Sequence, residues 1–165
     1  MTGIQSANLA VHGFSSDQAY LRLETELPRF RQPVAVVVLF MAALFGRNLD
    51  DNRPHLGPGL SWHPAEPHGR LASLVKLIAP FRKTDTVERG VAMTREVLGA
   101  TVTLARARGA RPLIVVPQFG VEAGVERALR RRILDETGLP YVWIEIDEVG
   151  ASPETSIPLP APPGR

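Results

Sequence analysis

The side chains that could carry out hydrolytic chemistry lie mostly in the first 70 residues of this chain. Ser15 and Ser16 follow the turn-forming residues 12–14, and all four histidines precede residue 70. A serine attacks a carbonyl only when a base accepts its proton, and His55 or His63 could be that base. One hypothesis is therefore a hydrolase with Ser15 as nucleophile and a loop histidine as base. The alternative is that both serines cap a helix.

Metal and thiol chemistry have little support. Six potential ligands share one loop, but their spacing matches no compact ligand motif such as two histidines one helical turn apart. They are His55, His63, His68, Asp50, Asp51 and Glu66. The chain has no cysteine, which excludes thiolate chemistry and disulfides. We therefore predict no metal site and no cofactor.

Composition and charge argue against nucleic acid as a partner. The 165 residues are 44% hydrophobic and carry a formal net charge of only +2. Four arginines cluster at positions 127 and 130–132, but acidic residues surround them and no aromatic residue is interleaved. Such a pattern is typical of a solvated helix face, so we predict no nucleic-acid binding.

No stretch of the sequence predicts a membrane span or a secretory signal. The longest apolar run covers residues 34–45, whereas a spanning helix needs roughly 20 residues. Residues 1–10 have neither a basic flank nor an apolar core. We therefore expect a soluble chain with no membrane partner. Its compartment stays open, with the cytoplasm as the default.

The run from Pro33 to Phe40 is the central element of the predicted fold. Seven of its eight residues are apolar and it does not alternate, which is typical of a strand buried on both faces of a parallel sheet. The polar residues 46–52 then fall beyond the carboxyl end of this strand. Open α/β sheets bind their ligands at that end, so we expect a site there.

The other elements alternate between strands and helices. Strands are predicted at 7–11, 111–117 and 141–146, with helices from about 15 to 27, 71 to 80, 85 to 109 and 121 to 137. This alternation predicts one α/β domain over residues 1–149, built as a three-layer sandwich. Residues 150–165 contain five prolines and no apolar periodicity, so we expect a disordered tail.

Two short motifs carry a resemblance to a known family. Asn8 and Gly13 match an Asn-x-x-x-x-Gly turn, and Gly46-Arg47-Asn48 matches part of a Gly-x-Asn-Asp turn after the next strand. The chain thereby resembles the SGNH/GDSL hydrolases, which are flavodoxin-like α/β esterases and lipases with a mostly parallel sheet and helices on both faces. The resemblance implies that the Gly13 N–H and the Asn48 amide stabilise an oxyanion. An ungapped alignment would put Arg47 in that donor position.

The resemblance also implies the ligand. Small esters or acetylated carbohydrates would bind beside Gly13 and Asn48, with contributions from Asn8, Arg47 and Gln118. Gln118 lies at the carboxyl end of its predicted strand, where it would line the crevice or satisfy the turn.

The nucleophile and the base of the family are not found. Its Gly-Asp-Ser block would precede Asn8, and its Asp-x-x-His pair has no counterpart because no histidine follows Asp147. We therefore predict an incomplete and catalytically impaired ester hydrolase domain. A binding or interaction module on the same fold and a hydrolase using Ser15 are the alternatives. Without the family's first strand, a sheet edge would be exposed, which predicts self-association through that edge.

Overall fold

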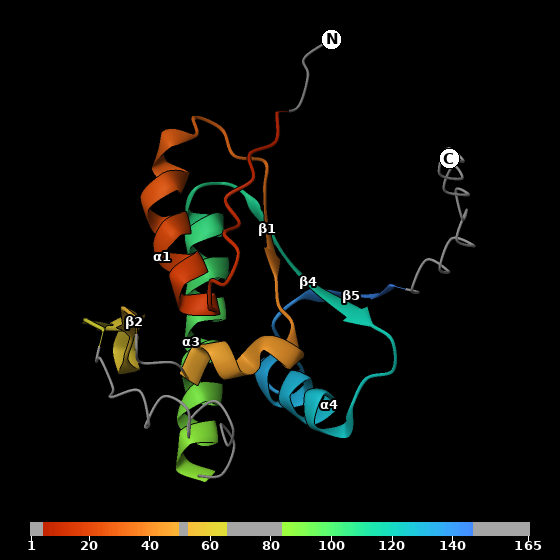
Figure 1. Ribbon diagram of the computed structural model, residues 1–165. Helices are drawn as coiled ribbons and strands as arrows, with labels where there is room; N and C mark the ends of the chain where they lie inside the picture. Colours follow the sequence, from red (N-terminus) through yellow and green to blue (C-terminus); the bar gives the residue numbers. More distant parts are fainter. Residues whose placement is uncertain (1–4, 50–52, 66–83, 147–165) are drawn as a thin grey trace, which may run out of the picture.

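The protein has a mixed α/β fold with a three-stranded parallel sheet at its centre (Figure 1). The computed structural model describes residues 5–49, 53–65 and 84–146. The sheet has the order β1-β4-β5, with β1 at Ala35–Leu39, β4 at Arg111–Phe119 and β5 at Tyr141–Ile146. A separate antiparallel hairpin pairs β2 (His55–Leu56) with β3 (Trp62–His63). The predicted α/β class is confirmed.

Helices connect these strands at close to the predicted positions. The longer ones are α1 (Ser16–Glu26), α3 (Thr84–Ala107) and α4 (Gly124–Arg130). The shorter ones are η1 (Leu27–Arg29), η2 (Ala42–Leu49), η3 (Pro58–Leu60) and the π-helical continuation of α4, η4 (Arg131–Asp135). Within the described ranges, no helix is long and apolar enough to cross a membrane. The helix predicted at 71–80 and the tail predicted at 150–165 lie outside the described residues.

The segment before α1 differs from the prediction. Residues 7–11 are not a strand, although their sequence is apolar enough for one. Asn8 accepts a hydrogen bond from the backbone N–H of Ala10 through its side-chain oxygen, at 2.9 Å. Such a local bond competes with strand pairing. Instead of pairing with the sheet, the segment packs Leu9 against the buried cluster that contains Leu23 and Leu27 of the α1–η1 segment.

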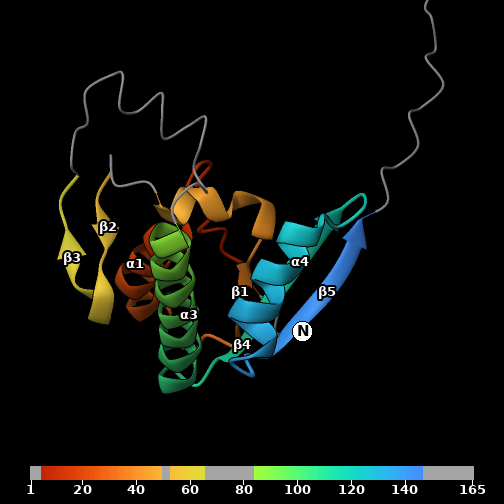
Figure 2. The same ribbon diagram turned by 90° about the horizontal axis from the view of Figure 1, so that it is seen from below.

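All the described helices beside the sheet lie on one of its faces (Figures 1 and 2). The side chains of Val38, Ile114 and Trp143 point toward them, because these residues share one face in the sheet register. The strand order explains the arrangement. Two right-handed crossovers that step in the same direction across a sheet place both connecting helices on the same face. The described residues thus form two layers, and the predicted three-layer sandwich is not confirmed.

The opposite face of the sheet is apolar and open. Val37 and Leu39 of β1 are 58% and 63% exposed. The prediction that this strand is buried on both faces is therefore wrong for the described residues. Its unbroken apolar sequence has the composition of a doubly covered strand, but the layer that would cover the second face is not among the described elements.

The core lies between the sheet and the helices. Phe45 of η2 is fully buried among residues of α3, β4 and α4, so the polypeptide that follows β1 is anchored to the main core. Leu129 and Ile133 are buried, whereas Val125 is 64% exposed. The helix predicted from about 121 begins only at Gly124, so Val125 lies in its first turn.

Candidate functional site

The turn at Gly13 and the chain that follows β1 meet beside the first turn of α1. Asn48 joins them. Its side-chain oxygen accepts a hydrogen bond from the Ser16 N–H at 2.9 Å, and its Nδ2 donates to the Ser16 hydroxyl at 3.3 Å. Asn48 Nδ2 also donates to Thr94 Oγ1 of α3 at 2.8 Å. The two motifs of the sequence resemblance are therefore held together in space, next to the carboxyl end of β1.

The two predicted oxyanion donors differ in what they can offer. Both N–H groups of the Asn48 amide are engaged, with Ser16 and Thr94, so this amide could bind an oxyanion only by giving up one of those bonds. Gly13 has φ at +86°, a left-handed conformation that favours glycine. Its carbonyl accepts from Arg53 at 2.7 Å. In the described part of the chain its N–H has no hydrogen-bond partner, so it is the donor that a ligand could use.

Ser15 is built into the start of α1. It is only 5% exposed, and its hydroxyl donates to the carboxylate of Asp17. Its backbone N–H donates to the Gln18 side chain at 3.4 Å. These bonds favour the capping interpretation of Ser15 over the nucleophile hypothesis, because no histidine in the described residues contacts the hydroxyl.

Asp17 connects α1 to the β2–β3 hairpin. Its carboxylate accepts from the backbone N–H of Leu56 at 3.0 Å and from that of Gln18 at 2.9 Å. Both Asp17 and Leu56 are buried. The hairpin is therefore fixed against the same end of α1 that carries the Gly13 turn.

The hairpin holds a hydroxyl–imidazole contact that the sequence analysis missed. Ser61 Oγ lies 3.1 Å from His63 Nε2 and also 2.9 Å from the Pro58 carbonyl oxygen, to which it can donate. The His63 ring stacks on His55, with 5.5 Å between ring centroids and 14° between planes. Ser61 is extended and directly precedes β3, and residues two apart in extended chain point to the same side, so that spacing was the signal available in the sequence.

A shallow groove of about 340 Å³ runs along the outer side of α1 from the residue after Gly13. Aliphatic and aromatic groups form much of its wall, which also includes the charged side chains of Arg22 and Glu26. Its lining residues are Phe14, Gln18, Leu21, Arg22, Thr25, Glu26 and Pro54. The groove offers an apolar surface that begins at Phe14, the residue after Gly13.

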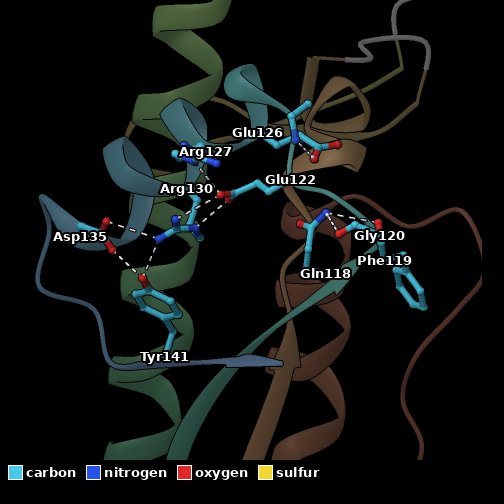
Figure 3. A network of polar contacts seen from close by, with 10 residues as sticks. Gln118, Phe119, Gly120, Glu122, Glu126, Arg127, Arg130, Asp135 and Tyr141 are labelled. Atoms are coloured by element: carbon cyan, nitrogen blue, oxygen red, sulfur yellow. Dashed lines mark hydrogen bonds and ion pairs between the residues drawn. The ribbon is translucent and has the colours of Figure 1, made fainter. Parts of the chain in front are cut away.

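The other predicted ligand-binding residues are not gathered at this place. Asn8 uses its side-chain oxygen within its own exposed turn. Gln118 lies at the carboxyl end of β4, where its Nε2 donates to the carbonyls of Phe119 at 3.3 Å and Gly120 at 3.4 Å (Figure 3). Gln118 therefore satisfies its own turn. Arg47 is half-buried on η2, next to Asn48 in the chain.

Among the described residues, no group of three or more histidine, cysteine, aspartate or glutamate side chains is placed to hold a metal ion. Four members of the loop set considered above, Asp50, Asp51, Glu66 and His68, lie outside the described residues.

A second polar network joins α4 to β5 (Figure 3). Arg130 donates to Glu122 at 3.0 Å and to the Tyr141 hydroxyl at 2.9 Å, and its guanidinium lies 4.7 Å from the centre of the Trp143 ring. The hydrogen bond from Arg130 lowers the pKa of Glu122, and burial raises the pKa of Tyr141. Tyr141 in turn donates to Asp135 at 2.7 Å. This network satisfies itself, which indicates a structural role.

The arginine cluster is largely paired with acidic residues. Arg127 contacts Glu122 at 3.1 Å, and Arg132 contacts Glu88 of α3 at 2.5 Å. Such pairing fits the predicted solvated helix face.

Comparison with known proteins gives no match. The chain matches no protein-family model, no curated protein and no solved structure. The assignment of function therefore depends on the residues and their geometry.

The contribution of the Asn48 hydrogen bonds can be tested by measuring the free energy of unfolding. Replacing Asn48 with alanine should lower the free energy of unfolding by about 1–2 kcal/mol, because the Ser16 N–H and the Thr94 hydroxyl lose a partner in a half-buried place. Asn8→Ala is the control, because it removes an exposed local bond and should cost less than about 0.5 kcal/mol. Urea unfolding measures both. Equal losses in the two variants would contradict the role of Asn48.

Proposed function

We propose that this chain is an SGNH-like α/β domain that binds small acylated molecules at the carboxyl end of β1 and is impaired as a hydrolase. One observation carries the proposal. The Asn48 side chain bonds to Ser16, which brings the Gly13 turn and the turn after β1 to the same place. In open α/β sheets this end of the strands is where ligands bind.

The order of the strands supports the proposed relationship. A flavodoxin-like sheet has the order 2-1-3-4-5, in which the last three strands succeed one another in a single direction. The order β1-β4-β5, with parallel pairing throughout, corresponds to that half. In this proposal β1 is the third strand of the family sheet, and the helices seen here form one of its two helical layers.

The impaired chemistry follows from the partners of the nearby serines. Ser15 is bonded to Asp17, and Ser16 is bonded to Asn48, so neither hydroxyl contacts an imidazole in the described residues. A serine without a base is a weak nucleophile. An oxyanion donor such as the Gly13 N–H then has no tetrahedral intermediate to stabilise, although it can still bind a ground-state carbonyl.

The proposed ligand combines an acyl group with a polar remainder. The groove along α1 presents Phe14 and Leu21 to an acyl chain, and the Gly13 N–H precedes Phe14 directly in the chain. Arg22 and Glu26 also line the groove, where hydroxyl groups could bond to them. Small esters and acetylated carbohydrates have this chemistry.

A second candidate function is slow ester hydrolysis on the hairpin, because Ser61 and His63 are in contact there. His63 Nε2 would take the proton from Ser61 as Oγ attacks the acyl carbonyl, and would return it to the departing alcohol. Water would then release the carboxylic acid and regenerate the serine, with the imidazole again as base. Catalysis requires the hydroxyl to turn from the Pro58 carbonyl toward the imidazole.

One pair of assays separates the two functions. Calorimetry with an acetylated sugar should show saturable binding that Phe14→Ala weakens about tenfold, whereas Phe30→Ala, an exposed phenylalanine outside the groove, should leave it unchanged. Turnover of an aryl acetate by the wild-type chain should be undetectable. A wild-type chain that shows no saturable binding and no turnover would contradict the proposal.

The hairpin candidate has its own expected pattern. Turnover would be lost in Ser61→Ala and in His63→Gln, and would be retained in Ser15→Ala, which serves as the matched serine control. Turnover that survives Ser61→Ala would rule out the hairpin pair as the catalytic groups.

A further inference from the structure

The face of the sheet that no described helix covers is a continuous apolar surface. Six large apolar side chains on it are between 36% and 63% exposed: Val37, Leu39, Leu113, Phe119, Val142 and Ile144. They come from all three strands, and the register places them on the same face. Monomeric soluble proteins rarely expose a contiguous apolar patch of more than a few hundred Å².

The chemistry of this open face is uniform. Ala35, Val115, Pro117 and Ile146 are its remaining members between the strand ends, and Arg111, at the start of β4, is its one charged residue in the described chain. The face therefore offers no hydrogen-bonding or charged group in its centre that could select a polar ligand. What it can recognise is another flat apolar surface.

We infer that a second copy of this chain packs on the open face, sheet against sheet, to form a two-fold symmetric dimer. The area supports this partner. If a fully exposed apolar residue of these types presents roughly 150–200 Å², the six exposed fractions leave roughly 450–600 Å² per copy, so a dimer would bury about 900–1,200 Å². The upper end of that range is the lower limit of stable, specific interfaces, about 1,200 Å².

The geometry of the face also suits a copy of itself. Two sheets pack about 10 Å apart with interdigitating side chains, and a two-fold axis lets the same patch serve on both sides. Pairing through a sheet edge, as predicted from the sequence, would extend the sheet but leave this apolar face in water. Packing of the two faces removes the exposed surface and places helices on the outside of a four-layer assembly.

The oligomeric state of the full chain tests this inference. Analytical ultracentrifugation from roughly 1 to 100 µM should show a monomer–dimer equilibrium. Val37→Glu and Val142→Glu should each raise the dimer dissociation constant about 100-fold or more, because symmetry buries two carboxylates. Val121→Glu is the control, since Val121 is 96% exposed outside the face and should leave the equilibrium unchanged.

Folding is checked separately by circular dichroism and by cooperative thermal unfolding. A glutamate on an exposed strand position of a folded monomer should preserve both signals, and a folded, monomeric Val37→Glu variant supports the interface. Three results would overturn the proposed interface. The first is a wild-type chain that stays monomeric at the highest concentration, and the second is a dimer that neither face variant weakens. The third result is a monomeric wild type that the Val37→Glu substitution unfolds, because the chain would then cover the face by itself.

Discussion

Replacing Asp17 with alanine is expected to lower the free energy of unfolding by about 3 kcal/mol and to release the β2–β3 hairpin from α1. The Asp17 carboxylate is 6% exposed and accepts from the Ser15 hydroxyl, the Gln18 N–H and the Leu56 N–H. Leu56 is 4% exposed, so its N–H would be left buried without a partner. Losing a charged acceptor costs more than losing a neutral one.

Denaturant unfolding and hydrogen exchange check this expectation. The amide of Leu56 should lose its protection in Asp17→Ala, while amides in the centre of α3 should follow only the global change. Glu24→Ala is the matched control on the same helix, because Glu24 is exposed and, within the described residues, its side chain accepts a hydrogen bond only from the Tyr20 hydroxyl, at 3.4 Å. A hairpin that keeps its protection without Asp17 would show that other contacts hold it.

Replacing Arg130 with alanine should have a comparable effect, about 3 kcal/mol, at the opposite side of the fold. The Arg130 and Glu122 side chains are only 17% and 10% exposed, so removal of the guanidinium leaves a largely buried carboxylate with the more exposed Arg127 as its remaining cation. The Tyr141 hydroxyl and the Trp143 ring lose a partner in the same change. Arg131→Ala is the control, because that neighbouring arginine is exposed.

The same pair predicts how stability depends on pH. Hydrogen bonding to Arg130 holds the pKa of Glu122 below its ordinary value of 4.5 in the folded state. Such a group contributes stability above pH 4.5, and that contribution is lost as the pH falls through the lowered pKa. Glu122→Gln should therefore be less stable than wild type at pH 7, and the difference should shrink on acidification.

Unfolding followed by fluorescence of the two tryptophans at several pH values measures this difference. Glu126→Gln is the control for a loss of charge on the same segment, because in the described part of the chain the Glu126 side chain bonds only to the nearby Ala123 N–H. A constant difference between wild type and Glu122→Gln from pH 7 to the acid range would contradict the role given to Arg130.

Local patterns in the sequence were sufficient for most of the elements. The strand at 141–146 has the predicted bounds, and α3 ends two residues before Gly109, whose φ is +75°. Apolar periodicity, a left-handed glycine and β-branched runs act over a few residues, so they can be read without the fold. The strand predicted at residues 7–11 does not form, because the bond that the Asn8 side chain accepts from the Ala10 N–H competes with a strand propensity that had no partner.

The candidate site depended on contacts between distant parts of the chain. The pairing of Asn48 with Ser16 crosses 32 residues, and that of Asp17 with Leu56 crosses 39. The contacts of Ser15 with Asp17 and of Ser61 with His63 join residues only two apart in the chain. The partners of Asn48 and of the Leu56 N–H, in contrast, follow from how the helices and the hairpin pack.

The amino-acid sequence by itself determined the α/β class and the three strands of the parallel sheet, because these follow from apolar periodicity and from β-branched runs. Only the tertiary structure decided which face of the sheet is covered. A run such as residues 33–40 is equally apolar on both sides, so its sequence cannot say how many layers pack on it. The direction of the crossovers settles that, and here it places every described helix beside the sheet on one face and leaves the other open.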